Sequence, residues 1–315
     1  MKKGHTVVAS GLNTKAFSKE QVRNTPSLTN VVAKKRLGEE MISKVDDLPS
    51  LPTVVTQILN LIQDEQSNAS NFEKYLRQDQ GLTARLLRIV NSSFFGLKHK
   101  VTSISQAVVI IGYQSLKNLV LAASTSKFLE GAFPGYGFKE QGLWQHSFMV
   151  ASWSQKIAIK LGWAKEEAEE MFVAGLLHDI GKLVMSSYVT EHCQEMIMFI
   201  IESKGDVCKA ESALMGVDHA EIGARIAQKW NFSNQLVNII KYHHNIEESS
   251  GSEKEVSLIN LVNYLLIKGQ YGMFENFPIV LSLDEFCKQT LNITDENIEG
   301  YSQEIHASAE NWEEC

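Results

Sequence analysis

Residues 175–182 read Gly-Leu-Leu-His-Asp-Ile-Gly-Lys and close an apolar stretch with helical periodicity. His178 lies on the same helical face as Met171, so it is expected to point inward together with the neighbouring Asp179. A buried aspartate beside a buried histidine is costly unless a cation balances it. A divalent metal can supply that charge, and so can Lys182, which follows one turn later.

The same helical periodicity extends over most of the chain. The sequence has 315 residues, 44% of them hydrophobic, which is enough for one large domain or two smaller ones. It contains only five prolines, and long proline-free stretches of Leu, Ile, Ala, Lys and Glu favour helices. Alternating patterns of the kind that predict strands are scarce. We therefore predict an all-α fold of two helical subdomains packed together.

Breaks in the pattern divide the chain. Three glycines and a proline within residues 130–137 mark the best boundary, and Gly112 interrupts an apolar stretch that suits a buried helix pair. Residues 245–255 form a polar, mobile-looking loop. The expected division is a polar, poorly ordered extension (1–33), an N-terminal helical subdomain (34–130), a C-terminal helical subdomain (131–270) and an acidic tail with a short amphipathic helix (271–315).

Five histidines follow one another at intervals of 32, 41, 24 and 1 residues: His146, His178, His219, His243 and His244. Their side chains could meet only through a fold. Neutral imidazoles with one carboxylate are the ligands expected for Fe, Mn, Zn or Ni. A single histidine of this kind is more often a core residue, and the adjacent pair taken alone is more typical of a helix C-terminal cap. The joint pattern favours a metal site.

Net charge, apolar runs and cysteine spacing indicate which classes of partner and which location the chain is expected to have. The net charge is −7, which argues against nucleic acid or an anionic membrane surface as a partner. The chain has no run of 18 apolar residues and no secretory signal, so no membrane span is expected. Its four cysteines form no C-x-x-C pair and are read as reduced thiols of a cytoplasmic protein.

These residues carry a resemblance to known proteins. His146, the run from His178 to Lys182, the segment His219-x-Glu-Ile-Gly and the final histidine pair resemble the HD superfamily of metal-dependent phosphohydrolases. Further motifs resemble the HDOD family, an HD-related output domain of bacterial signalling proteins. They are Leu48-Pro49-x-Leu51-Pro52, Asn91-Ser92-Ser93-Phe94-Phe95-Gly96, Ser105-Gln106-Ala107, Ile111-Gly112-Tyr113 and Lys117-Asn118-Leu119. The resemblance covers roughly residues 35–270.

The resemblance implies two metal positions bridged by Asp179. The first position would use His146, His178 and Asp179, and the second would use Asp179, His219, His243 and His244, so one or two ions can be held. Lys182 would face a phosphate, and Lys182 and Asp179 would be the catalytic residues of an active enzyme.

Two departures from the superfamily pattern weaken the expectation of catalysis. Asn263, a neutral and weaker ligand, stands where the superfamily has a final Asp. The Gly-Tyr-Pro loop of cyclic di-GMP phosphodiesterases is also absent after the histidine pair. A two-metal mechanism needs both ions, so loss of a carboxylate from the first position impairs it directly.

The preferred interpretation is a signalling output or regulatory module with an HD-like metal pocket and little or no turnover. Its partners would be other signalling proteins, with a nucleotide as a candidate ligand, and residues 130–137 would act as its hinge. The alternatives are an active metal-dependent phosphohydrolase or phosphodiesterase on a nucleotide or cyclic dinucleotide, and a structural protein whose histidines only pack.

Overall fold

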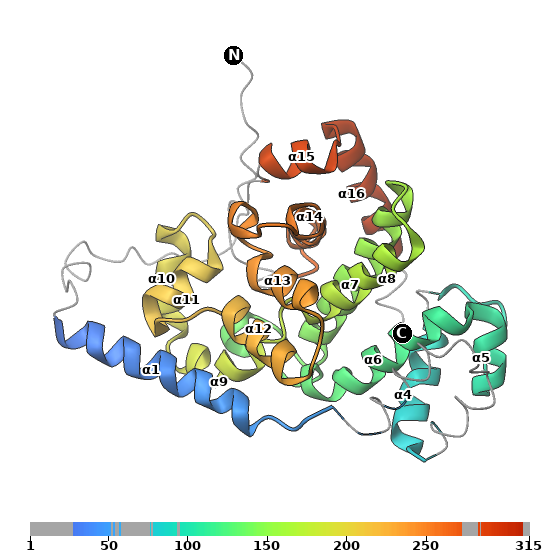
Figure 1. Cartoon of the computed structure of the whole chain (residues 1–315), viewed down its shortest axis with the longest axis horizontal. Helices are drawn as coiled ribbons and strands as arrows, with labels where there is room; N and C mark the ends of the chain where they lie inside the picture. Colours follow the sequence, from blue (N-terminus) through green and yellow to red (C-terminus); the bar gives the residue numbers. More distant parts are fainter. Residues whose placement is uncertain are drawn as a thin grey trace.

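The computed structural model describes residues 28–51, 78–92, 95–272 and 285–310, together with Thr53, Gln57, Leu76 and Leu283. Within these residues every regular element is a helix, and the one β-type pairing is an isolated bridge between Phe133 and Phe138 (Figure 1). The all-α prediction is confirmed. None of the described helices is both long enough and apolar enough to cross a membrane.

The described part of the N-terminal block contains α1 (Leu28–Asp47), α4 (Gln80–Val90), α5 (Ile104–Ile111) and α6 (Tyr113–Leu129). The predicted break near Gly112 is confirmed, because this glycine has φ = 83° between α5 and α6, a conformation that other residues rarely adopt. α4 buries Leu82 and Leu86 and packs against α6. Phe94 and most of residues 52–77 lie outside the described part of the chain.

The C-terminal block surrounds a tightly packed helix pair. Its helices are α7 (Gly142–Lys160), α8 (Lys165–Leu177), α9 (Lys182–Glu191), α10 (Cys193–Glu202), α11 (Val207–Met215), α12 (His219–Lys229), α13 (Asn234–Tyr242), α14 (Glu253–Lys268), α15 (Glu285–Leu291) and α16 (Asp295–Glu310). α7 and α8 approach closely at Gly175, where an added Cβ would lie 2.7 Å from the backbone nitrogen of Ala151. α14 packs against α7, α8 and α13.

α1 packs against the C-terminal block, although its sequence falls within the N-terminal one. It lies along α9, α11 and α12 (Figure 1). Lys229, at the end of α12, donates hydrogen bonds to the carbonyl oxygens of Val45, Asp46 and Leu48 at 2.6–2.9 Å. These are carbonyls at the C-terminal end of α1, where the helix supplies too few backbone donors. The end of α12 therefore anchors the end of α1.

The connecting segment between the blocks is packed against its neighbours, and its role as a hinge stays a prediction. It contains a short 3-10 helix, η2 (Pro134–Tyr136), and its aromatic residues Phe133, Tyr136 and Phe138 are buried. The backbone nitrogen of Gly135 donates to Thr190 Oγ1 of α9 at 3.2 Å. An added Cβ at Gly135 would lie 2.5 Å from the backbone nitrogen of Thr190, so the glycine permits this close approach. Apolar burial thus fixes the segment against α9.

The predicted polar loop and the acidic tail also contain packed structure. Residues 245–255 include η3 (Ile246–Glu248), whose first side chain, Ile246, is buried, and α14 begins within the same segment. In the tail, α15 and α16 pack against α14, and Cys287 of α15 is buried. Lys160 of α7 pairs with Glu304 of α16. A few apolar side chains in otherwise polar stretches are enough to hold both segments on the core.

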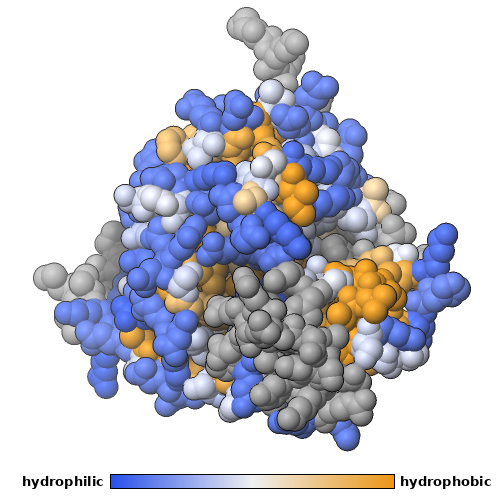
Figure 2. Space-filling view, turned by 45° about the vertical axis from the view of Figure 1, so that its right-hand side comes forward, coloured by the Kyte–Doolittle hydropathy of each residue, from blue (hydrophilic) through white to orange (hydrophobic). Residues whose placement is uncertain are grey.

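On the face shown in Figure 2, the described surface is mainly hydrophilic, with an apolar area on the side where α5 lies. On α5, the side chain of Val109 is 83% exposed and that of Ile110 is 51% exposed. This area belongs to the N-terminal block and lies apart from the histidines.

Candidate metal centre

The turn between α8 and α9 brings the predicted ligands together. α8 ends at Leu177, and the turn residues His178 and Asp179 are fully buried. An added Cβ at Gly181 would lie 2.0 Å from the carbonyl oxygen of His219. Only glycine allows the turn to approach the start of α12 so closely, and this approach brings Asp179 to His219.

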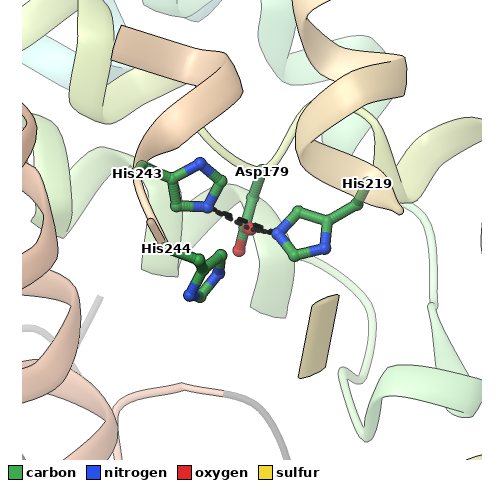
Figure 3. A group of neighbouring side chains, drawn as sticks. All are labelled: Asp179, His219, His243 and His244. Atoms are coloured by element: carbon green, nitrogen blue, oxygen red, sulfur yellow. Dashed lines mark hydrogen bonds and ion pairs between the residues drawn. The ribbon is translucent and has the colours of Figure 1, made fainter. Parts of the chain in front are cut away.

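One group of four side chains converges on a common point. Asp179, His219, His243 and His244 each offer a ligand atom, and these atoms lie within 4.8 Å of one another. His219 Nε2 is 3.2 Å from Asp179 Oδ1 and 3.3 Å from His243 Nε2. Figure 3 shows the rings of His219 and His243 pointing toward the carboxylate from different helices. These are the four residues expected at the second metal position.

A second group shares the same carboxylate. His146, His178 and Asp179 also place ligand atoms within 4.8 Å of one another. The Nε2 atoms of the two histidines face Asp179 Oδ2, at 3.7 Å for His146 and 3.4 Å for His178. The same oxygen accepts a hydrogen bond of 2.5 Å from Nζ of the buried Lys182. Asp179 therefore presents Oδ1 to one group, and Oδ2 to the other group and to the lysine.

Hydrogen bonds at Nδ1 set the orientation of the rings. Nδ1 of His178 lies 2.7 Å from the carbonyl oxygen of Gly175, and Nδ1 of His243 lies 2.7 Å from that of Ile240. Nδ1 of His146 likewise faces a backbone carbonyl, at 2.9 Å. Because a carbonyl oxygen only accepts, Nδ1 carries the proton and Nε2 presents a lone pair to the centre. His243 therefore caps α13 and also presents a metal-ligand atom to the centre.

Burial keeps most of these rings neutral. It lowers the pKa of His146 to about 4, and it lowers the pKa values of His243 and His244 well below the ordinary range of histidine. A neutral imidazole with a free Nε2 lone pair is the form that binds a metal.

At Asp179 and His219, nearby charges shift the pKa in the direction opposite to the effect of burial. Burial would raise the pKa of Asp179, but the nearby His178 and Lys182 lower it well below the ordinary value. Burial would lower the pKa of His219, but the Glu211 carboxylate raises it well above the ordinary value. The metal-free centre therefore holds an ionised carboxylate beside a proton on His219. A metal ion would displace such a proton on binding.

Several polar atoms in this region have no hydrogen-bond partner among the described residues. They include His178 Nε2, Asp179 Oδ1, His244 Nε2 and Asn263 Oδ1. Buried polar atoms are normally paired, because an unpaired one costs about 1–3 kcal/mol. All four are metal-ligand atom types, so the residues present fit a divalent cation. Asn263 itself lies buried on α14.

Two buried residues that form a hydrogen-bonded chain with His219 are absent from the residues predicted from sequence. Glu211 on α11 is fully buried, and its Oε2 lies 2.6 Å from Nδ1 of His219. Tyr136 on η2 donates to Glu211 Oε1 at 2.6 Å. A single glutamate in an amphipathic helix gives no signal of burial, and a tyrosine between glycines has the composition of a linker. The sequence pattern therefore reveals neither the partner of His219 nor the partner of Glu211.

Comparison with known proteins agrees with this geometry. The HDOD domain family model matches residues 48–246. The chain belongs to the HDOD family. The matched residues of this HDOD chain include Asp179 and all five of the predicted metal-ligating histidines, from α7 to the end of α13. The match ends before α14, so Asn263 lies outside it.

Relatives of the HDOD chain extend this comparison. An uncharacterised protein of Treponema pallidum is 28% identical over 216 residues, which cover 67% of this chain but only 40% of that relative. The chain thus spans less than half the length of this relative. An HDOD domain protein of unknown function from Geobacter sulfurreducens has a TM-score of 0.68 at 24% identity, covering 88% of this chain and 97% of the other.

A further solved structure carries a description of activity. A protein of Shewanella amazonensis, described as a candidate phosphohydrolase, has a TM-score of 0.60 and 26% identity. The similarity covers 85% of this chain and 97% of that protein. The all-α arrangement is therefore shared over nearly the whole length of both solved relatives.

Proposed function

We propose that this HDOD chain is a regulatory module of bacterial signalling. Its buried HD-like centre binds a divalent transition metal ion, with little or no hydrolytic turnover. The observation that carries the proposal is the convergence of His219 Nε2 and His243 Nε2, 3.3 Å apart, on one oxygen of Asp179. This arrangement favours a cation at their meeting point, because two imidazole nitrogens and a carboxylate oxygen from three separate segments are ligand atoms that one ion would bind together.

The donor set limits the choice of metal. Three imidazoles and one carboxylate suit Fe, Mn, Zn or Ni, and the four ligand atoms already lie within 4.8 Å of one another. When bound, such an ion can polarise a phosphoryl oxygen or bound water. The chain's own contribution is to hold the rings: Nδ1 of His243 is fixed by Ile240, and Nδ1 of His219 is fixed by Glu211.

Three features support weak or absent turnover. Lys182 holds Asp179 Oδ2 at 2.5 Å, so a first-position ion must compete with an ammonium group for that oxygen. Asn263 adds no negative charge to that position. The ligands His146, His178 and His219 are also at most 2% exposed. A second ion and a substrate phosphate both need space and access, and this packing favours neither.

The closed centre supports a role in recognition between proteins. A metal that holds α12 and α13 to the turn before α9 would stabilise the surface these helices present to other signalling proteins. A nucleotide is the other candidate ligand. The alternative function is an active phosphohydrolase on a nucleotide or cyclic dinucleotide, and it is favoured by the contact between Lys182 and Asp179, which puts a phosphate-binding side chain beside a metal ligand.

Metal content and hydrolysis together test the proposal. Protein purified without chelator should carry Fe, Mn, Zn or Ni by elemental analysis, and His243→Ala should lose most of it. Cyclic di-GMP and bis(p-nitrophenyl) phosphate should not be hydrolysed at useful rates with any of these metals. Turnover of about 1 per second or faster, ordinary for an enzyme, would establish the alternative. Absence of metal even after reconstitution would refute the metal site.

Asn263→Asp is the matched variant for this experiment. It restores a carboxylate at nearly constant volume, so it should raise metal content at the first position. We expect no useful hydrolysis, because the lysine still occupies Asp179 Oδ2 and the access of substrate is unchanged. Hydrolytic activity in this variant would show that the chain lacks activity only because Asn263 carries no negative charge.

A further inference from the structure

His219 differs from the other inward-facing histidines in what holds its ring. His146, His178 and His243 each have Nδ1 against a backbone carbonyl. Nδ1 of His219 instead faces the carboxylate of Glu211, at 2.6 Å from Oε2. The same oxygen accepts a hydrogen bond from the backbone nitrogen of His219 at 2.8 Å. One carboxylate oxygen therefore fixes both the ring and the first residue of α12.

The other oxygen of this carboxylate is also occupied. Glu211 Oε1 accepts a hydrogen bond of 2.6 Å from the hydroxyl of Tyr136, and both residues are completely buried. A carboxylate without access to water is expensive unless its oxygens are hydrogen-bonded. Here the ring and backbone of His219 and the tyrosine hydroxyl supply those hydrogen bonds. The position of Glu211 is therefore determined by His219 and Tyr136.

The physical effect of such a carboxylate on a ligand is known in general terms. A carboxylate that accepts the Nδ1 proton fixes the ring orientation and makes Nε2 a better electron donor. Loss of this kind of partner typically costs roughly 10- to 100-fold in metal affinity. A backbone carbonyl fixes the ring in the same way but carries no net charge. Among the histidines around Asp179 Oδ1, His219 is thus equipped to be the strongest imidazole donor.

We propose that Glu211 is the positioning residue that sets the metal affinity of the HDOD centre, acting through His219, and that Tyr136 holds Glu211 in place. This inference rests on the proposed metal-binding function and adds how that binding is tuned. Tyr136 belongs to the segment that connects the two helical blocks, and its ring also lies 5.5 Å from Nζ of Lys182. Through Tyr136, the segment between the two helical blocks therefore contacts both the Glu211 carboxylate and Lys182.

Cys208 offers a different use of the same carboxylate. Its Sγ lies 3.9 Å from Nδ1 of His219, and Cys208, Glu211 and His219 form a group with metal-ligand atoms within 4.8 Å of one another. Both oxygens of Glu211 already accept hydrogen bonds, however, so a metal on this side would have to displace the ring and the tyrosine. Cys208→Ala is therefore a control that should leave metal affinity unchanged.

The experiment measures Co²⁺ affinity of the full chain by competition with a chromophoric chelator, and follows the visible absorption of the bound ion. Glu211→Gln keeps the shape of the side chain and removes its charge, so affinity should fall roughly 10- to 100-fold. Tyr136→Phe removes a buried hydrogen bond but keeps the contact between Glu211 and His219. It should lower the affinity for Co²⁺, but by less than Glu211→Gln does, because His219 still holds the carboxylate. Native affinity in Tyr136→Phe would show that Tyr136 does not position Glu211.

A double-mutant cycle separates this role from general structural damage. In a His219→Ala background, Glu211→Gln should cause no further loss of Co²⁺ affinity, because its effect passes through that ring. An equal loss in both backgrounds, or native affinity in Glu211→Gln, would overturn the inference while leaving the metal site in place. If the native chain binds neither Co²⁺ nor any of the four proposed metals, the proposed function and this inference both fall.

A conservative variant covers the case in which Glu211→Gln fails to fold. Glu211→Asp keeps the charge but withdraws it from Nδ1 of His219 by one methylene group. Its affinity for Co²⁺ should lie between those of the native chain and His219→Ala. Native affinity in Glu211→Asp would show that contact with Nδ1 is not required and would contradict the proposal.

Discussion

Replacing Gly181 with alanine tests how tightly the fold holds the centre. An added Cβ would lie 2.0 Å from the carbonyl oxygen of His219 and 2.7 Å from the backbone nitrogen of Gly223. Real Cβ contacts essentially never fall below 3.0 Å, so the turn and α12 must separate by about 1 Å. Such overpacking costs typically 1–3 kcal/mol, which for a chain of this length corresponds to an unfolding temperature lower by roughly 2–5 °C.

The effect on the metal should be larger than the effect on stability. Metal-ligand distances tolerate only about 0.2 Å of error, and a shift of about 1 Å separates Asp179 from His219. Calorimetry and elemental analysis of Gly181→Ala should therefore show a folded protein with little metal. Gly300→Ala is the matched control, because an added Cβ there meets nothing within 4 Å on α16. Native unfolding temperature and metal content in Gly181→Ala would refute the close-approach argument.

Three further predictions concern charge and ligands. Lys182→Met should destabilise the metal-free protein by roughly 3–5 kcal/mol in denaturant unfolding, because it leaves the buried Asp179 unpaired, and bound metal should reduce this loss. An equal loss with and without metal would contradict a cation beside Asp179. His219→Ala should lower metal content more than His146→Ala, since the first position keeps only the shared carboxylate of Asp179 and has Asn263 in place of the superfamily's final Asp; the reverse order would exclude the assigned division of ligands. The pKa values of His146 and His243 are lowered by folding, so only the unfolded chain takes up these protons as the pH falls. The metal-free protein should therefore lose stability from about pH 6.5 down to about pH 4, measured by urea unfolding, and a flat profile there would contradict the burial of neutral rings.

The features that sequence predicted well depend on short-range pattern. The helix break at Gly112 follows from a glycine inside an apolar stretch, and the all-α fold follows from the scarcity of alternating patterns. The converging histidines were predictable because several imidazoles on apolar helical faces are unusual. Metal occupancy itself stays a prediction.

The features that sequence could not provide depend on long-range packing. Tyr136 and Glu211 are 75 residues apart, and each looks ordinary in its own segment. Residues 130–137 have the composition of a linker, and nothing in their local pattern indicates that Phe133 and Tyr136 are buried. The attachment of α1 to the C-terminal block depends on Lys229, a residue type that usually stays in solvent. Such contacts become visible only when the helices are placed in space.

The burial of most of the ligands has a consequence for rates. Asp179, His219 and His243 are inaccessible to solvent, while His244 is partly exposed. We therefore expect an ion to enter and leave slowly, past His244 or through a transient opening of α12 or α13. If opening limits exchange, the rate will be the same for every metal and independent of chelator concentration, whereas a path past His244 would make it depend on both. In a living cell, slow exchange would make the ion content of this centre lag behind changes in metal supply.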